Sequence, residues 1–211
     1  MADIAIVDYG MGNLRSVQQA LRTVAPDASI VVTGDPREVE LATRVVFPGQ
    51  GAMPDCMREL DARGLRTAVL EAAHGKPFLG ICIGLQMLFE HSAEGDIPGL
   101  GILKGSVVRF AQNLRDEQGS KLKVPHMGWN QVHHATHPLW NGIDQDARFY
   151  FVHSYYVQPQ EEELVQATSC YPQPFSCAVA RDNLFAVQFH PEKSASAGLT
   201  LLRNFVGWNP A

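Results

Sequence analysis

The chain has 211 residues, of which 45% are hydrophobic and 18% charged, proportions typical of a globular protein with a sizeable core. Its formal net charge is −5 and it carries no basic stripe, so we expect no nucleic-acid partner. The longest apolar stretch, from Pro77 to Phe89, is too short to span a bilayer, and the N-terminus lacks a charged segment followed by an apolar one. We therefore expect neither a membrane segment nor a secretory signal.

The first part of the chain alternates short apolar runs with stretches of helical periodicity. Strands are predicted for 4–7, 30–32, 44–47 and 78–81, and helices for 14–24 and 60–73. Pro48 and Gly49 are expected to stop the strand before them. Strands that alternate with helices favour βαβ units and a parallel sheet with helices on both faces.

The second part predicts mainly strands, at 106–110, 148–152 and 163–167, and a hairpin that joins 178–180 to 185–187. A closing helix is expected over 198–206, and the polar stretch 111–123 is expected to be a mobile loop or an exposed hairpin tip. We therefore expect residues 1–211 to form a single α/β domain. Its open, mainly parallel central sheet would have helices on both faces and an antiparallel extension in the C-terminal half.

The four cysteines, Cys56, Cys82, Cys170 and Cys177, form no Cys-x-x-Cys pair and are few for a disulfide scaffold. Without an export signal, the expected compartment is a reducing cytoplasm. We expect Cys56, Cys170 and Cys177 to be inert thiols.

Cys82 differs because glycines flank it in Gly80-Ile81-Cys82-Ile83-Gly84, after an apolar strand. A nucleophile on a sharp strand-to-helix turn needs small residues two positions before and after it. The helix expected to follow would point its N-terminus toward the sulfur and favour the thiolate. A small buried core thiol is the alternative interpretation of this motif alone.

A second motif, from Leu184 to Glu192, predicts a buried strand that ends in His190 and Glu192. Cysteine, histidine and glutamate in this order form a cysteine-based acyl-transfer triad, and the two elements need to meet only in space. A structural histidine is the alternative, but both motifs together predict a thiol hydrolase.

Pro48-Gly49-Gln50-Gly51 ends a predicted strand, and its two glycines let the backbone turn N–H groups toward a ligand. Acyl transfer needs such donors for the developing oxyanion. A plain turn is the alternative. Beside the Cys82 turn, the functional interpretation is favoured.

Two other patterns suggest ligands more weakly. Gly10-Met11-Gly12-Asn13 lies where a phosphate loop would sit, but Arg15 stands in place of the third glycine of the dinucleotide fingerprint. A tight turn is favoured there, and no cofactor is expected. The group His133, His134 and His137 has no obvious fourth ligand, so we expect no metal site.

The motifs together resemble those of the triad-type, class I glutamine amidotransferases. This general resemblance rests on the Cys82 turn with Gln86, on Phe47-Pro48-Gly49 and on the run from Phe189 to Ser194. Almost end to end, the chain is similar to one family among them, the glutaminase subunit of imidazole glycerol phosphate synthase. The segments that carry this narrower resemblance are Pro125 to Asn130, Tyr150 to Tyr155 and Asp8 to Asn13.

The resemblance implies an enzyme that hydrolyses L-glutamine to glutamate and ammonia. Cys82 would attack the carboxamide, His190 would activate the thiol and protonate the ammonia, and Glu192 would orient the imidazolium. Activity is then expected to fall as His190 becomes protonated. The resemblance assigns binding of the oxyanion to the backbone N–H groups of Gly49, Gln50, Gly51 and Ile83. It assigns binding of the substrate to Gln86, Ser154 and Tyr155.

The resemblance also implies a partner, a (β/α)8-barrel cyclase that forms a heterodimer with the chain and receives the ammonia. The joint products would be imidazole glycerol phosphate and an aminoimidazole carboxamide ribotide, in histidine biosynthesis. Met127, Trp129 and Asn130 would belong to the docking surface and Lys193 to the partner-facing mouth, with core packing as the alternative for Trp129. Where the family often has valine, this chain has Gln50, which would leave a backbone donor intact.

Three other functions stay open from the sequence. A glutaminase of pyridoxal phosphate or anthranilate synthesis would share the triad but lack the segment 127–130 and Lys193-Ser194. A thiol peptidase on a related scaffold would cleave peptides without a partner. A non-catalytic binding subunit would have no physical reason to keep Cys82, His190 and Glu192 together.

Overall fold

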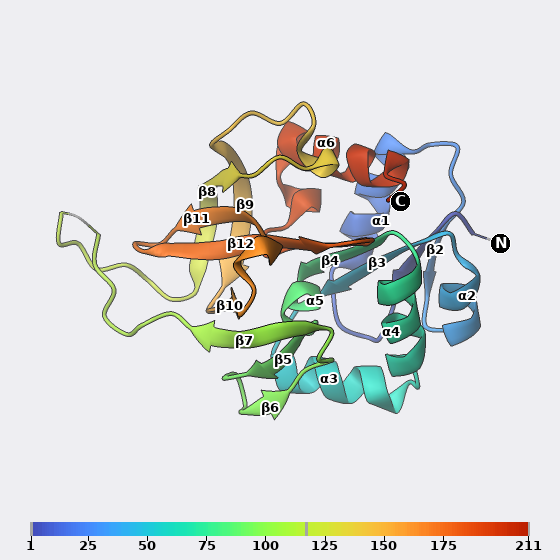
Figure 1. The fold of residues 1–211 in the computed structure, drawn as a ribbon, viewed down its shortest axis with the longest axis horizontal. Coiled ribbons are helices and arrows are strands. Elements are labelled where there is room, and N and C mark those ends of the chain that lie inside the picture. Colours follow the sequence, from blue (N-terminus) through green and yellow to red (C-terminus); the bar gives the residue numbers. More distant parts are fainter. Residues whose placement is uncertain (1, 117, 211) are drawn as a thin grey trace.

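The computed structural model describes residues 2–116 and 118–210. In this part of the chain thirteen strands form one sheet, whose central strands follow the order β2-β1-β3-β4-β13 and are all parallel (Figure 1). These five strands are β1 Ile4–Val7, β2 Ile30–Thr33, β3 Arg44–Gly49, β4 Phe78–Cys82 and β13 Leu184–Val187. β1, β4 and β13 are buried along their whole length, as expected for parallel strands covered on both faces.

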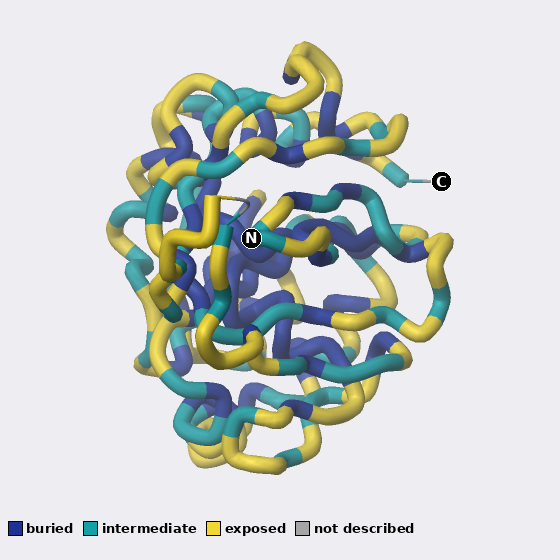
Figure 2. The backbone as a smooth tube through the Cα atoms, turned by 90° about the vertical axis from the view of Figure 1, so that its left-hand side faces the viewer, coloured by how far each residue is buried: buried dark blue, intermediate teal, exposed yellow. Residues whose placement is uncertain are grey.

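Helices cover both faces of this parallel sheet. α1 and α6 pack against each other on one side, and α2, α3 and α4 lie on the other (Figure 1). Buried residues gather in the interior of the molecule, and exposed residues lie around it (Figure 2). The helices are α1 Leu14–Val24, α2 Pro36–Leu41, α3 Met53–Ala62, α4 Arg66–Gly75, α5 Ile83–Gln86 and α6 Ala195–Gly207.

Beyond β13 the sheet continues as β12-β10-β7-β5-β6, and β11, β8 and β9 branch from β12. Every pairing here is antiparallel except the parallel pair β5 and β7. The expected fold class, a parallel sheet with an antiparallel extension, is thus confirmed. The strands of the extension are β5 Phe89–Ser92, β6 Ile97–Pro98, β7 Leu103–Arg109, β8 His126–His134, β9 Ala147–His153, β10 Tyr155–Pro159, β11 Val165–Cys170 and β12 Pro174–Arg181.

Several element boundaries differ from the sequence predictions. The predicted helix 60–73 is two helices, α3 and α4, separated where Gly64 takes a φ of +66°. β3 continues through Pro48 to Gly49. β1 pairs with β3 only as far as Val46, so a residue without an N–H is tolerated beyond that point.

Other elements were missed or shifted. α2, β5, β6, β8 and β10 were not predicted, and the predicted strand 163–167 begins as a 3₁₀ turn, Glu162–Leu164, before β11. In the segment 111–123 the described residues form an isolated antiparallel bridge between Arg115 and Lys121. No helix of the described residues is long and apolar enough to cross a membrane.

Candidate active site

The Cys82 turn has the strained geometry that its flanking glycines predict. Cys82 lies at φ 57° and ψ −111°, a region that non-glycine residues enter at a cost of about 1–3 kcal/mol. A Cβ on Gly84 would lie 1.9 Å from the Phe47 carbonyl oxygen, and one on Gly80 would lie 2.9 Å from the Ala186 Cβ. The turn is therefore packed too closely for any other residue at either glycine.

The helix after this turn is shorter than predicted. α5 ends at Gln86, and the chain re-enters the sheet as β5 at Phe89. A helix does begin directly after Cys82, but four residues carry little macrodipole, so we expect it to stabilise a thiolate only weakly. Other groups must stabilise negative charge on the Cys82 sulfur.

Parallel pairing brings the separate motifs to one edge of the sheet. β3 pairs Gly49 with Cys82, and β13 pairs Val187 with Ile81. The carboxyl ends of three strands therefore meet, which is where open α/β sheets place their ligand sites. His190 follows β13 by three residues and reaches the same edge.

His190 and Glu192 are paired and buried. The Nδ1–H of His190 donates to Oε1 of Glu192 at 2.9 Å, across the 3₁₀ turn Pro191–Lys193. The turn is anchored by Ser194, whose hydroxyl donates to the His190 carbonyl at 2.6 Å and accepts from the Tyr150 N–H at 2.9 Å. This hydrogen bonding fixes the imidazole ring beside the Cys82 turn.

Burial alone would lower the pKa of His190, but the Cys82 sulfur and the Glu192 carboxylate outweigh it and raise this pKa to about 10. The protonated form of the His190 ring is therefore favoured by its surroundings. The expectation that activity falls as His190 becomes protonated stays a prediction.

A cavity of about 320 Å³ opens over the Cys82 turn. Most residues predicted for the triad, the oxyanion and the substrate line it, together with Lys193, which was predicted for the partner-facing mouth: Gln50, Gly51, Cys82, Ile83, Gln86, Ser154, Tyr155, His190 and Lys193. Gly49 and Glu192 do not line it, but Gly49 pairs with Cys82 at the end of β3 and Glu192 is hydrogen-bonded to His190. Gln86 is almost fully buried, and its Nε2 donates to the Tyr155 carbonyl at 3.1 Å.

Four further residues line this cavity that the sequence did not identify: Glu94, Pro125, Val152 and His153. Glu94 matters most, because it is the carboxylate of the lining set. Its Oε2 accepts from the Met53 N–H at 2.9 Å, which holds the side chain in place. A lone glutamate in a turn has no distinctive sequence pattern. The interpretation of Tyr150 to Tyr155 as a motif could have drawn attention to His153.

The residues predicted for partner docking lie on or near the surface of β8. Met127 and Trp129 are 61% and 49% exposed, so the core-packing alternative for Trp129 is wrong. Asn130 is half-buried and donates to the Cys170 carbonyl at 2.8 Å. Lys193 lines the catalytic cavity, as predicted for a residue at its mouth.

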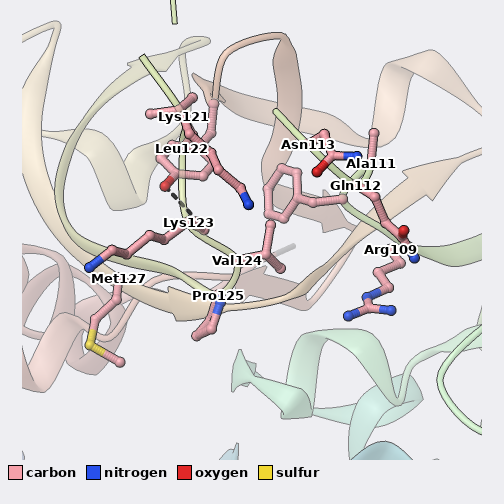
Figure 3. Close-up of a pocket in the computed structure, with 12 residues that line it drawn as sticks. Arg109, Ala111, Gln112, Asn113, Lys121, Leu122, Lys123, Val124, Pro125 and Met127 are labelled. Carbon is pink, nitrogen blue, oxygen red and sulfur yellow. Dashed lines mark hydrogen bonds between the residues drawn. The ribbon is translucent and has the colours of Figure 1, made fainter. Parts of the chain in front are cut away.

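A larger cavity of about 880 Å³ lies between β7, the segment 111–124 and the start of β8 (Figure 3). Its lining contributes the cations Arg109, Lys121 and Lys123 and, among the described residues, no carboxylate or thiol. It shares Pro125 with the catalytic cavity, so the two adjoin. Cys82 and His190 line the smaller cavity and not this one.

The histidines considered for a metal serve other roles. In the described part of the chain no group of three or more His, Cys, Asp or Glu side chains is placed to hold a metal ion. His134 contacts the backbone oxygens of Ala135 and Ile143, and His137 accepts from the Leu139 N–H. Burial lowers the pKa of His137 to about 4.

The remaining cysteines are free thiols outside the catalytic cavity. Cys56 and Cys177 are buried, and burial raises the pKa of Cys56 to about 11 and that of Cys177 further. Cys170 is exposed. The turn at Gly10 is closed by Asp8, whose Oδ1 accepts from the Gly10 N–H at 2.8 Å, which fits the tight-turn interpretation.

The fold and the site correspond to a known class. The family model of class I glutamine amidotransferases matches residues 5–207, and the chain belongs to this family. A solved structure of a glutamine amidotransferase has the same fold. Its TM-score is 0.72, with 17% identity over 98% of this chain and 100% of that one.

Within the family, relatives named "Imidazole glycerol phosphate synthase subunit HisH" are much more similar. The one from Nitrosospira multiformis is 66% identical over 100% of both chains. The one from Thiobacillus denitrificans is 65% identical over 99% of this chain and 92% of the relative. The narrower resemblance to this subunit is thereby confirmed.

Proposed function

We propose that this chain is the glutaminase subunit of an imidazole glycerol phosphate synthase. It hydrolyses L-glutamine to glutamate and ammonia and passes the ammonia to a cyclase subunit. The observation that carries this proposal is the strained Cys82 turn beside His190, which is hydrogen-bonded to Glu192. Cys82 and His190 line one cavity at one edge of the parallel sheet.

The chemistry follows from this arrangement. The Cys82 thiolate attacks the side-chain carboxamide carbon of glutamine, and the negative charge moves to the carboxamide oxygen. Backbone N–H groups of Ile83 and the Gly49 to Gly51 turn stabilise that oxyanion. The His190 imidazolium gives its proton to the departing nitrogen, ammonia leaves, and a thioester remains. Water, deprotonated by His190, then releases glutamate and regenerates the thiolate.

The charges of the cavity suit a free amino acid. Glu94 is placed to pair with the α-ammonium group of glutamine, and it keeps its own position through the Met53 N–H. The backbone and side chains around Ser154 and Tyr155 would hold the α-carboxylate. Gln86 supports this part of the cavity indirectly, because its side-chain amide already donates to the Tyr155 carbonyl.

The partner in this proposal is a (β/α)8-barrel cyclase that forms a heterodimer with the chain. Exposed Met127 and Trp129, with Asn130 beside them, form the docking surface on β8, and Lys193 lies at the mouth that faces the barrel. The same proposal treats residues 1–211 as one amidotransferase domain, in keeping with the continuous sheet that joins β1 to β13.

The test is glutamate release from glutamine by the chain alone and by the chain with a cyclase barrel and its nucleotide ligand. We expect strong stimulation by the liganded barrel and loss of activity in Cys82→Ala by at least about 10³-fold. Equal rates with and without the liganded barrel would contradict the proposed coupling between glutaminase and cyclase. Peptide cleavage without glutaminase activity would replace the proposal with a thiol peptidase.

A further inference from the structure

Two buried glutamines connect the Cys82 sulfur with a backbone carbonyl. The Nε2 of Gln86 donates both to the Tyr155 carbonyl, at 3.1 Å, and to Oε1 of Gln188, at 3.0 Å. The Nε2 of Gln188 in turn donates to the Cys82 Sγ at 3.8 Å, within the reach of a hydrogen bond to sulfur. Gln86 and Gln188 are 1% and 0% exposed, so solvent does not compete for these groups.

A pair of buried histidines occupies the other side of the same carbonyl. The Nδ1 of His153 lies 2.8 Å from the Tyr155 oxygen, and the Nδ1 of His126 lies 3.0 Å from Nε2 of His153. Burial lowers the pKa of His153 to about 3 and that of His126 to about 4, so both rings are neutral at neutral pH. Asn130 completes the series, with its Nδ2 3.3 Å from Nε2 of His126.

The Tyr155 carbonyl sets the direction of every hydrogen bond in this series, because a carbonyl can only accept. His153 must therefore carry its proton on Nδ1, and its Nε2 must accept from Nδ1–H of His126. On the other side Gln86 must present its NH₂ group to the carbonyl. That NH₂ group also faces Gln188, so Gln188 must present its oxygen there. Its own NH₂ group is then left for the Cys82 sulfur.

We propose that Gln188 is a further catalytic residue of this site, whose amide N–H stabilises the Cys82 thiolate, and that Gln86 is a positioning residue that holds that amide in the donating orientation. The proposal rests on the glutaminase function above. It assigns Gln86 a role through Gln188, in addition to its place at the substrate cavity.

The sulfur needs such a donor for two reasons. Cys82 is 4% exposed, and a buried anion requires hydrogen bonds in place of water. The four-residue α5 supplies little dipole, and His190 gives up its proton during the reaction. When water attacks the thioester and the thiolate is expelled, Gln188 remains as a fixed donor. This leaving-group step is where we expect its largest effect.

The experiment measures the thiolate directly, by its ultraviolet absorbance and by the rate at which iodoacetamide alkylates Cys82, located by mass spectrometry. All variants carry Cys170→Ser, because Cys170 is exposed and would react as well. In Gln188→Met, which keeps the length but removes the donor, we expect the thiolate fraction and the alkylation rate near neutral pH to fall about tenfold. For glutamine hydrolysis, kcat should fall by a similar factor, with KM changed less than about twofold.

Three comparisons separate this role from a structural one. Gln145→Met is the matched control, since Gln145 bonds the His134 backbone away from the cavity, and its alkylation rate should stay at that of the parent. Gln188→Glu replaces a donor with a negative charge, so its alkylation rate should be lower than that of Gln188→Met. A folded Gln188→Met with the parent's thiolate absorbance and alkylation rate would overturn the proposal.

If Gln188→Met does not fold, Gln86→Met tests the proposal in its place. It leaves Gln188 in place but frees its amide to rotate, so alkylation should slow in the same direction by at least about threefold. An unchanged rate there would overturn the proposal as well. Alkylation needs neither glutamine nor a cyclase, so this result stands separately from the outcome of the glutaminase assay.

Discussion

The parallel and antiparallel parts of the sheet contribute different parts of the site. The parallel strands β3, β4 and β13 end together and supply the Gly49 to Gly51 turn, Cys82 and His190. The antiparallel part supplies the wall at Ser154 and Tyr155 and the exposed side chains of β8. Parallel strands buried on both faces have a tightly specified register, whereas antiparallel strands with one solvated face can carry recognition surfaces.

This division predicts different consequences for the two parts. Substitutions at the parallel edge should lower kcat or prevent folding. Substitutions in the antiparallel part and its connections should change KM for glutamine or the affinity for the partner. The four changes below test this from the largest expected effect to the smallest.

Glu192→Gln should lower kcat by about 10³-fold, because the carboxylate no longer stabilises the His190 imidazolium. It should also lower the pKa of His190, measurable by nitrogen chemical shifts of the ring. In the parent this pKa is about 10, above the value of about 6.5 for an unfolded histidine. The stability that it contributes is thus complete below about pH 6.5 and lost as the pH rises through about 10. The free energy of unfolding of Glu192→Gln should therefore decline less steeply over this pH range than that of the parent. An equal decline would contradict the pairing of Glu192 with His190.

Gly84→Ala should destabilise the fold by about 3 kcal/mol, because the new Cβ would overlap the Phe47 carbonyl oxygen. Gly75→Ala is the control, since a Cβ at the end of α4 meets no atom within 4 Å. It should be neutral or stabilising by up to about 1 kcal/mol. Denaturant unfolding measures both, and similar midpoints would show that the Cys82 turn is not closely packed.

Glu94→Gln should raise KM for glutamine by about 10–100-fold with a much smaller effect on kcat, since the amide keeps an acceptor for the Met53 N–H but loses the charge for the α-ammonium group. Steady-state kinetics with the liganded cyclase present measures the split. A fall confined to kcat would place Glu94 in the chemistry and not in substrate binding.

Trp129→Ala should weaken binding of the cyclase by about tenfold, as expected for a large exposed aromatic side chain at an interface. Leu41→Ala, at a similarly exposed apolar residue on α2, is the matched control and should leave the affinity unchanged. Titration calorimetry gives both values. Equal affinities would move the docking surface away from β8.

The sequence predicted the parts of the site that depend on local chain geometry. The spacing of glycines around Cys82 indicated a tight turn, and the alternation of strands and helices indicated which strand ends would meet. It also predicted β1 and α1 with their observed boundaries. It overestimated the helix after Cys82, because the apolar run to Phe89 reads equally well as helix or strand, and only pairing with β7 decides between them.

The sequence by itself thus determined the parallel sheet and predicted Cys82, His190 and Glu192 as the triad, since burial and backbone strain leave local patterns. The tertiary structure alone decided that Glu94 faces the cavity, that the pKa of His190 is raised, and that Gln188 directs an N–H at the sulfur. These features depend on contacts between segments far apart in the chain. The Tyr155 carbonyl sets the direction of the hydrogen bonds that lead to Gln188, and burial and neighbouring groups set the pKa of His190. No single segment of the chain encodes either.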